Sequence, residues 1–228
     1  GEQIMNMNVS RAEIKAQAKE QLRGKVWMFF LVNVIVYAIL IPISFLAEME
    51  GAASIIGLIA MYVVTPPLEI GLVMVYLDVT YGDPVEISTL FKGFKMMGKS
   101  IALFLWMLLF ILLWSCLFII PGIIKSYSYS MAWYILAENP DMTAREALTE
   151  SKIIMNGHKF DFFVLQLSFF FWAMLIVVTL GIAAIYVSPY QQLTFTNFYH
   201  NIKRQPAPVA EEVYAEPVYT EPVADVIE

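Results

Sequence analysis

The chain has 228 residues, of which 59% are hydrophobic and 15% are charged. An ordinary soluble domain carries about 25% charged residues, so this composition excludes a water-soluble globule and also excludes disorder over most of the chain. The net charge of −6 arises from six acidic residues in the last 18 positions, and the rest of the chain is neutral. The single cysteine, Cys116, excludes an internal disulfide framework and a cysteine-rich metal site.

Long apolar runs predict an all-α membrane protein, because a helix needs about 20 mostly apolar residues to cross the bilayer core. The runs cover residues 26–47, 52–78, 100–137 and 160–199. We expect an interruption in the second run at Thr65-Pro66-Pro67, and breaks in the later runs at Pro121-Gly122, near Gly181 and at Pro189. Together they predict six transmembrane helices in three hairpins.

The basic residues predict the orientation of these six spans. The segments before span one, between spans two and three, between spans four and five, and after span six hold 13 of the 14 bases. The three opposite connections hold none. Because lysine and arginine concentrate on the cytoplasmic side of membrane proteins, we expect a multi-pass protein of the cell (inner) membrane with both termini in the cytoplasm.

The cytoplasmic segments resemble one another and predict a pseudo-threefold repeat. Ser10 is followed by Glu13, and Thr143 is followed by Glu146, which is the spacing of a helix capping box. Each hydroxyl residue precedes a glycine by 14 positions, and such a glycine can end a helix in the left-handed conformation. In the middle copy, which ends at Gly98, either Asp83 or Ser88 can serve as the cap, so two registers are open. The repeat units are 8–82, 83–138 and 139–202.

Each predicted cytoplasmic helix is amphipathic, which is typical of helices that lie at the membrane surface. In the first of them, basic residues recur at every fourth position beside the apolar face. This spacing predicts contacts with anionic lipid head groups, although the same residues could instead serve only to anchor the topology. The basic residues are Arg11, Lys15, Lys19 and Arg23.

Two charged residues fall inside predicted spans. Glu69 and Lys125 each follow a proline and each lie 14 residues before the cytoplasmic end of their span. Gln191 and Gln192 follow Pro189 in the third unit in the same way. At a rise of about 1.5 Å per residue these positions have similar depth, so we expect them to face a common axis as an intramembrane polar site.

A charge inside the bilayer is unfavourable by a few kcal/mol or more unless it is paired or hydrated. Three interpretations of Glu69 and Lys125 therefore stay open. The residues can form a functional site for a substrate or ion, or a structural pair that fixes helix packing. Alternatively, Lys125 can extend its side chain to the outer head groups.

Motifs for catalysis and for cofactor, metal or nucleic-acid binding are missing from the sequence, so we expect neither an enzyme nor a cofactor. The segment 203–228 repeats Glu-Pro-Val and is acidic. This composition predicts a disordered cytoplasmic tail, which is either a solvated terminus or a binding motif for a protein partner.

Several segments of the chain resemble a family of bacterial integral membrane proteins, the domain-of-unknown-function 975 family. The resemblance covers about residues 8–200 and is most specific over Pro121–Met131, with further matches at Gly71–Asp78, Gly82–Glu86, Leu90–Lys95 and Gly157–Lys159. It implies a polytopic protein of the bacterial inner membrane and implies no activity, cofactor or catalytic residue.

The features together favour a non-enzymatic membrane protein that transports or handles a small or amphiphilic molecule through the polar site. The alternative is a membrane scaffold or regulator, which would recruit cytoplasmic partners through its surface helices and its tail. The lipid bilayer, with anionic lipids, is the partner that the sequence indicates, and the sequence is also compatible with a homo-oligomer.

Overall fold

The computed structural model describes residues 10–117 and 119–204, which form helices and short connections without a strand. The predicted tail lies outside the described residues from 205 onward. The helices in chain order are α1 (Arg11–Leu22), α2 (Val26–Glu48), α3 (Ala52–Tyr81), α4 (Ile87–Lys92), the 3-10 helix η1 (Gly93–Met96), α5 (Met97–Leu117), α6 (Ile119–Tyr129), α7 (Ala132–Glu138), α8 (Ala144–Ile154), α9 (Lys159–Leu167), α10 (Phe170–Val178) and α11 (Ala184–Lys203).

The predicted capping boxes are confirmed at the start of α1 and α8. The Glu13 N–H donates to Ser10 Oγ at 3.2 Å, and the Ser10 N–H donates to the Glu13 carboxylate at 2.7 Å. Thr143 and Glu146 make the same reciprocal pair at 3.3 and 2.7 Å. Each box satisfies two backbone N–H groups at a helix start.

The glycines that follow α1 and α8 also adopt the predicted left-handed conformation, with φ of 76° at Gly24 and 83° at Gly157. The middle unit departs from this pattern. Its helix α4 begins after Glu86 without a side-chain cap, and Gly98 is the second residue of α5 rather than a left-handed glycine that ends a helix. The first and third units therefore share a local structure that the second lacks.

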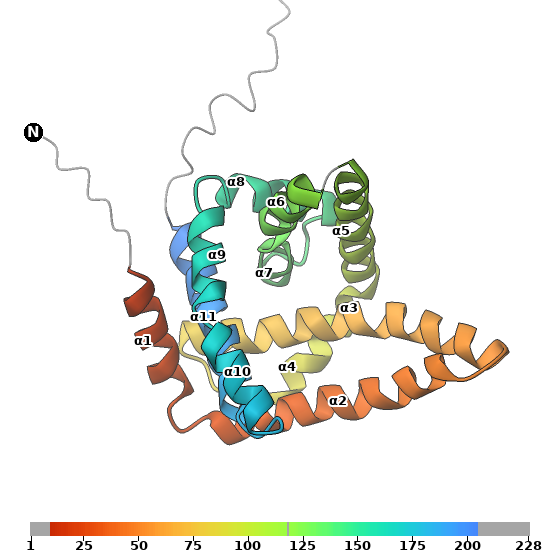
Figure 1. Ribbon diagram of the computed structural model, residues 1–228, viewed down its shortest axis with the longest axis horizontal. Coiled ribbons are helices and arrows are strands. Elements are labelled where there is room, and N and C mark those ends of the chain that lie inside the picture. Colours follow the sequence, from red (N-terminus) through yellow and green to blue (C-terminus); the bar gives the residue numbers. More distant parts are fainter. Residues whose placement is uncertain (1–9, 118, 205–228) are drawn as a thin grey trace, which may run out of the picture.

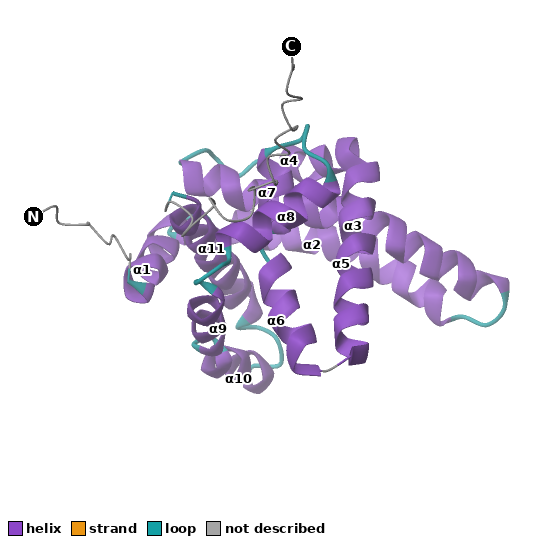
Figure 2. Ribbon diagram, turned by 90° about the horizontal axis from the view of Figure 1, so that it is seen from above, coloured by secondary structure: helices purple, strands orange, loops and turns teal. Residues whose placement is uncertain are grey.

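Helical hairpins extend from a common hub, which is the region where α3 packs against α4, η1 and α11 (Figure 1). They consist of α2 with α3, α5 with α6, and α9–α10 with α11, while α1, α7 and α8 lie near the hub. In Figure 1 the hairpin of α2 and α3 extends to the right whereas α9–α10 runs downward. In Figure 2 the hairpin of α5 and α6 runs toward the bottom of the view, at an angle to α2 and α3. The hairpins therefore separate toward their connecting turns.

Two of the predicted helix breaks are wrong, because α3 continues through Pro66 and Pro67 and α11 continues through Pro189. A proline removes one backbone donor and bends a helix, but packing against neighbouring helices can keep the helix continuous. The break predicted at Pro121-Gly122 is displaced, because α5 ends at Leu117 and α6 already begins at Ile119. The break near Gly181 is confirmed, where Leu180 and Gly181 have φ of 52° and 92°. The chain also breaks between α6 and α7, where the sequence predicted one continuous span.

Four helical segments of the described chain are long and apolar enough to cross a membrane. The predicted spans four and six are not among them. α6 and α7 are separated by a turn, and α11 carries polar residues and is largely buried in the hub. The all-α class is confirmed by the structure, and these four helices indicate a membrane protein. The four segments are Val26–Glu48, Ala52–Tyr81, Ile87–Ser115 and Lys159–Val178.

The outer faces of the hairpins expose large apolar side chains. Phe171 is 80% exposed, Val178 is 75% exposed, and Trp27 and Ile120 are each 71% exposed. Soluble monomeric proteins seldom expose contiguous apolar patches larger than a few hundred Å², so this surface requires lipid or a protein partner to cover it.

The hub holds α3 against α4 and η1 through direct contact between backbones. A Cβ atom added to Gly71 would lie 1.9 Å from the Leu90 carbonyl oxygen, and one added to Gly93 would lie 2.0 Å from the Pro67 oxygen. Only glycine permits so close an approach at these two positions. Pro67 is two residues from both Thr65 and Glu69, so the contact also fixes the turn of α3 that carries these two side chains.

Candidate functional site

Glu69 lies in the middle of α3 on the helix face that also carries Tyr62, Thr65 and Pro66, because these residues follow helical spacing. This face borders an open groove of about 320 Å³ between α3, α5 and α7. Four apolar residues of α5, again at helical spacing, form the opposite wall. The groove is lined by Thr65, Pro66, Glu69, Phe104, Met107, Leu108, Ile111 and Trp133.

The polar groups on the α3 side of the groove can accept hydrogen bonds, and the Thr65 and Glu69 side chains lack partners within the described chain. The Thr65 hydroxyl oxygen is buried and makes no hydrogen bond there. The Glu69 carboxylate belongs to none of the ion pairs among residues 10–117 and 119–204. Because Pro66 has no N–H, the Tyr62 carbonyl also loses its usual helical donor. The groove thus combines apolar walls with acceptors that a ligand could engage.

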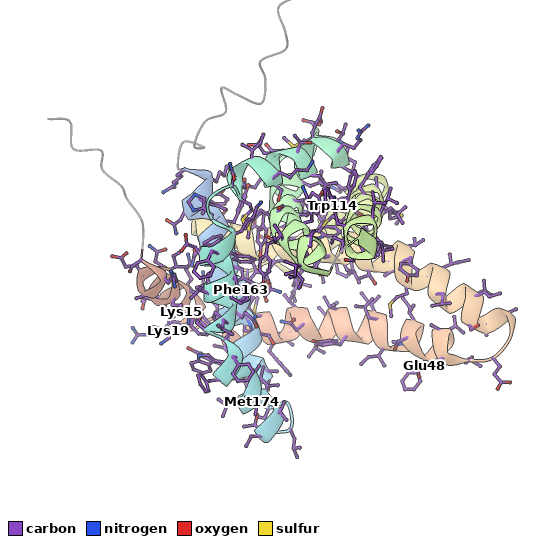
Figure 3. The ribbon with its side chains drawn as sticks, turned by 45° about the horizontal axis from the view of Figure 1, so that its top comes forward. Lys15, Lys19, Glu48, Trp114, Phe163 and Met174 are labelled. Atoms are coloured by element: carbon purple, nitrogen blue, oxygen red, sulfur yellow. The ribbon has the colours of Figure 1, made fainter. Side chains whose placement is uncertain are left out.

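The structure does not bring Lys125 together with Glu69. The Lys125 ammonium lies over the ring of Trp114 on α5, 4.7 Å from the ring centroid, and Lys125 is not among the residues that line the Glu69 groove. Figure 3 labels Trp114 on this hairpin. A cation over an indole face is stabilised by the ring quadrupole, so Lys125 has a local partner within the hairpin of α5 and α6.

Gln191 and Gln192 lie on α11 and are half-buried, and neither lines the groove that contains Glu69. The four predicted members of one polar site therefore occupy different places in this structure. The sequence prediction counted residues from each polar position to the cytoplasmic end of its span, and equal counts give equal positions only when the hairpins run in similar directions. The hairpins instead diverge, so equal counts do not bring these residues together (Figures 1 and 2). Glu69 is the predicted site residue that lines the groove.

The basic residues predicted for α1 all have partners within the chain. Lys15 and Lys19 point toward the third hairpin (Figure 3), and partial burial, then the neighbouring charge of Lys19, lower the pKa of Lys15. The head-group contacts stay a prediction, since Arg11, Lys19 and Arg23 are also exposed. The partners are Asp161 at 3.2 Å from Arg11, the Phe169 ring at 4.7 Å from Lys15, the Tyr190 ring at 5.7 Å from Lys19, and Glu20 at 3.9 Å from Arg23.

A second polar cluster, which the sequence did not predict, surrounds Glu138 at the end of α7. The side chain of Glu138 is only 9% exposed and pairs with Lys203. It also accepts hydrogen bonds from Tyr199 at 2.6 Å and from Tyr81. Because the partners lie 57 to 65 residues away in sequence, no local motif marks them. The cluster joins α3, α7 and α11 beside a cavity of about 350 Å³.

Glu138 and the nearby His200 have shifted pKa values, each for its own reasons. Burial tends to raise the pKa of Glu138, but hydrogen bonds from Lys203, Tyr199 and Tyr81 outweigh it and hold the pKa below 4.5. Burial, together with the positive charges of Arg204 and Lys203, lowers the pKa of the nearby His200 below 6.5, against the opposing effect of Glu138. Both shifts favour the ionisation states at neutral pH, a negative carboxylate and a neutral imidazole.

Among the described residues, no group of three histidine, cysteine, aspartate or glutamate side chains is arranged to hold a metal ion. The helical architecture with long apolar hairpins indicates an integral membrane protein. A family model described as a protein of unknown function (DUF975) matches residues 5–125 and 118–206, and the chain belongs to this family. No curated protein and no solved structure matches the chain significantly.

Proposed function

We propose that this protein binds and handles an amphiphilic molecule within the membrane, through the groove that Glu69 lines. The observation that carries the proposal is the chemistry of the groove. Its apolar walls on α5 suit an alkyl chain, and the unpartnered acceptors on α3 suit a polar head group. Ligand sites commonly combine mostly apolar walls with a few placed polar groups. The family is described as one of unknown function, so membership in it indicates no particular activity.

The topology that accompanies this function is six membrane segments with both termini in the cytoplasm. The segments that hold 13 of the 14 bases lie on or next to the hub, and the hairpin turns near residues 50 and 181 hold none. This placement supports a hub on the cytoplasmic side, with hairpins inserted into the bilayer. α6–α7 and α11 would then be the return arms, shielded from lipid in part by the hub.

Accessibility to a membrane-impermeant thiol reagent tests the topology. Single cysteines replace Glu50, Lys95 or Glu150, which are all exposed, in a Cys116→Ser background. In spheroplasts we expect labelling at position 50 only, and after permeabilisation we expect labelling at all three. Labelling of position 95 or 150 from outside would exclude a cytoplasmic hub.

A photoactivatable alkanol of about 16 carbons, with a diazirine on its chain, tests occupation of the groove in lipid nanodiscs. We expect cross-links on α5 between Phe104 and Ile111, mapped by peptide mass spectrometry. Leu108→Trp fills the groove and should abolish these cross-links, whereas Leu113→Trp, on the same helix but outside the groove, should preserve them. Equal labelling of both variants would contradict the proposed function.

A further inference from the structure

We propose that the head group bound at Glu69 is an ammonium, so that the ligand is a cationic alkylamine without an anionic group beside its charge. This inference rests on the proposed function and names the class of its ligand. It follows from which hydrogen-bonding groups the groove offers and which it lacks.

The acceptors in the groove and next to it lie together on one face of α3, where Thr65 and Glu69 line the groove and Tyr62 lies beside it. Residues 62, 65, 66 and 69 fall within one helical stripe. A helix directs its carbonyls toward its C-terminal end, so the carbonyl freed at Tyr62 by Pro66 points along the face toward Thr65 and Glu69. A carbonyl oxygen, a hydroxyl oxygen and a carboxylate are therefore directed to one region. An ammonium carries three N–H donors and no acceptor, which complements this set.

Charge supports the same choice of ligand. The lining residues of the groove include one carboxylate and no lysine, arginine or histidine. A carboxylate among apolar side chains is stabilised in its charged form only when a cation accompanies it. Lys125 lies over Trp114 instead of supplying that cation. A phosphate or carboxylate on the ligand would meet like charge from Glu69, which argues against a zwitterionic phospholipid.

The aromatic residues at the groove complete the site. Trp133 on α7 and Phe104 on α5 both line it, and the Phe104 ring lies 5.8 Å from the ring of Tyr62. Aromatic faces attract alkylammonium groups, and indole does so best. The wall formed by Met107, Leu108 and Ile111 then accommodates the alkyl chain.

Competition between matched ligands tests this class of head group. The probe is a photoactivatable 16-carbon primary amine that carries a diazirine on its chain, and its competitors are dodecylamine, dodecanol and dodecanoate. We expect dodecylamine to halve cross-linking of α5 at a concentration about 10- to 100-fold lower than dodecanol, which is the effect of a charged hydrogen bond. Dodecanoate should compete least.

The variant Glu69→Gln keeps the shape of the side chain and removes its charge, so the advantage of dodecylamine over dodecanol should fall to about onefold. The control Glu48→Gln removes an exposed carboxylate at the far end of the first hairpin (Figure 3) and should preserve the advantage. Cross-linking of the alkanol probe in Glu69→Gln shows that the variant folds.

Each outcome separates this inference from the proposed function. If amine and alkanol both label the groove with equal strength, and Glu69→Gln changes neither, the groove binds amphiphiles but the ammonium assignment is wrong. Preference for dodecanoate would overturn it in the same way. If neither probe labels α5, the inference and the proposed function both fail.

Discussion

Gly71→Ala is expected to destabilise the protein by roughly 3 kcal/mol or more. The added Cβ would lie 1.9 Å from the Leu90 carbonyl oxygen, a distance that nonbonded atoms do not reach. The neighbouring atom belongs to the backbone of α4, so no side chain can rotate away and the two helices must separate. Overpacking in a core generally destabilises by about 1–3 kcal/mol and occasionally more, and a clash with backbone belongs at the upper end.

Gly98→Ala is the matched control for this prediction. Gly98 is the second residue of α5, and an added Cβ would meet no atom within 4 Å. Alanine is the better helix former by about 1 kcal/mol, so this variant should be neutral or slightly stabilised. Thermal unfolding in detergent, followed by tryptophan fluorescence, compares the two variants. Similar melting temperatures for Gly71→Ala and the wild type would contradict the close packing of α3 on α4.

The separation of α3 from α4 in Gly71→Ala also has a consequence for the site. Pro67 lies next to Gly93 at this contact and is two residues from both Thr65 and Glu69. If the contact positions the groove, the variant should lose cross-linking by the alkanol probe even at temperatures where it stays folded. Gly98→Ala should retain it. The packing and the proposed binding surface would then be linked through one helix.

The sequence predicted the features that depend on neighbouring residues. The capping boxes at Ser10 and Thr143 follow from a four-residue pattern, and both are confirmed by the structure. The apolar runs likewise located the helices, because burial in lipid or protein demands continuous apolar segments. Proline positions were less informative, since Pro66 and Pro189 bend or weaken a helix without ending it when neighbouring helices support it.

Features that depend on how the hairpins are arranged in space could not be predicted in the same way. The depths of Glu69 and Lys125 were counted along the chain, and that count carries no information about the directions in which the hairpins diverge. Glu138 stands at the end of an apolar run, where its position resembles that of an ordinary polar flank. Its role becomes visible only when α11 brings Tyr199 and Lys203 to it.

Glu138→Gln is expected to destabilise the protein by about 2–3 kcal/mol at neutral pH. Glutamine offers one acceptor oxygen where the carboxylate offers two, so the three donors Tyr81, Tyr199 and Lys203 can no longer all be satisfied. A hydrogen bond to a charged group contributes about 1.5–3 kcal/mol, and the burial of Glu138 limits compensation by water.

Glu20→Gln provides the comparison, because it also removes a carboxylate from an ion pair. The side chains of Glu20 and Arg23 are 76% and 81% exposed and lie 3.9 Å apart. Exposed pairs contribute about 0–1 kcal/mol, so this change should have little effect on the melting temperature. Comparable losses in the two variants would show that the Glu138 cluster contributes no more than a surface pair.

The pH dependence of the difference between wild type and Glu138→Gln isolates this carboxylate. Its pKa in the folded state lies below the ordinary value of 4.5, so its contribution is fully present above pH 4.5 and is lost as the pH falls through the folded-state pKa. The stability difference between the two proteins should therefore stay constant from neutral pH down to about 4.5 and shrink below it. A difference that instead widens with acid would mean that Glu138 carries a raised pKa, and that Lys203 and the two tyrosines do not stabilise its charge.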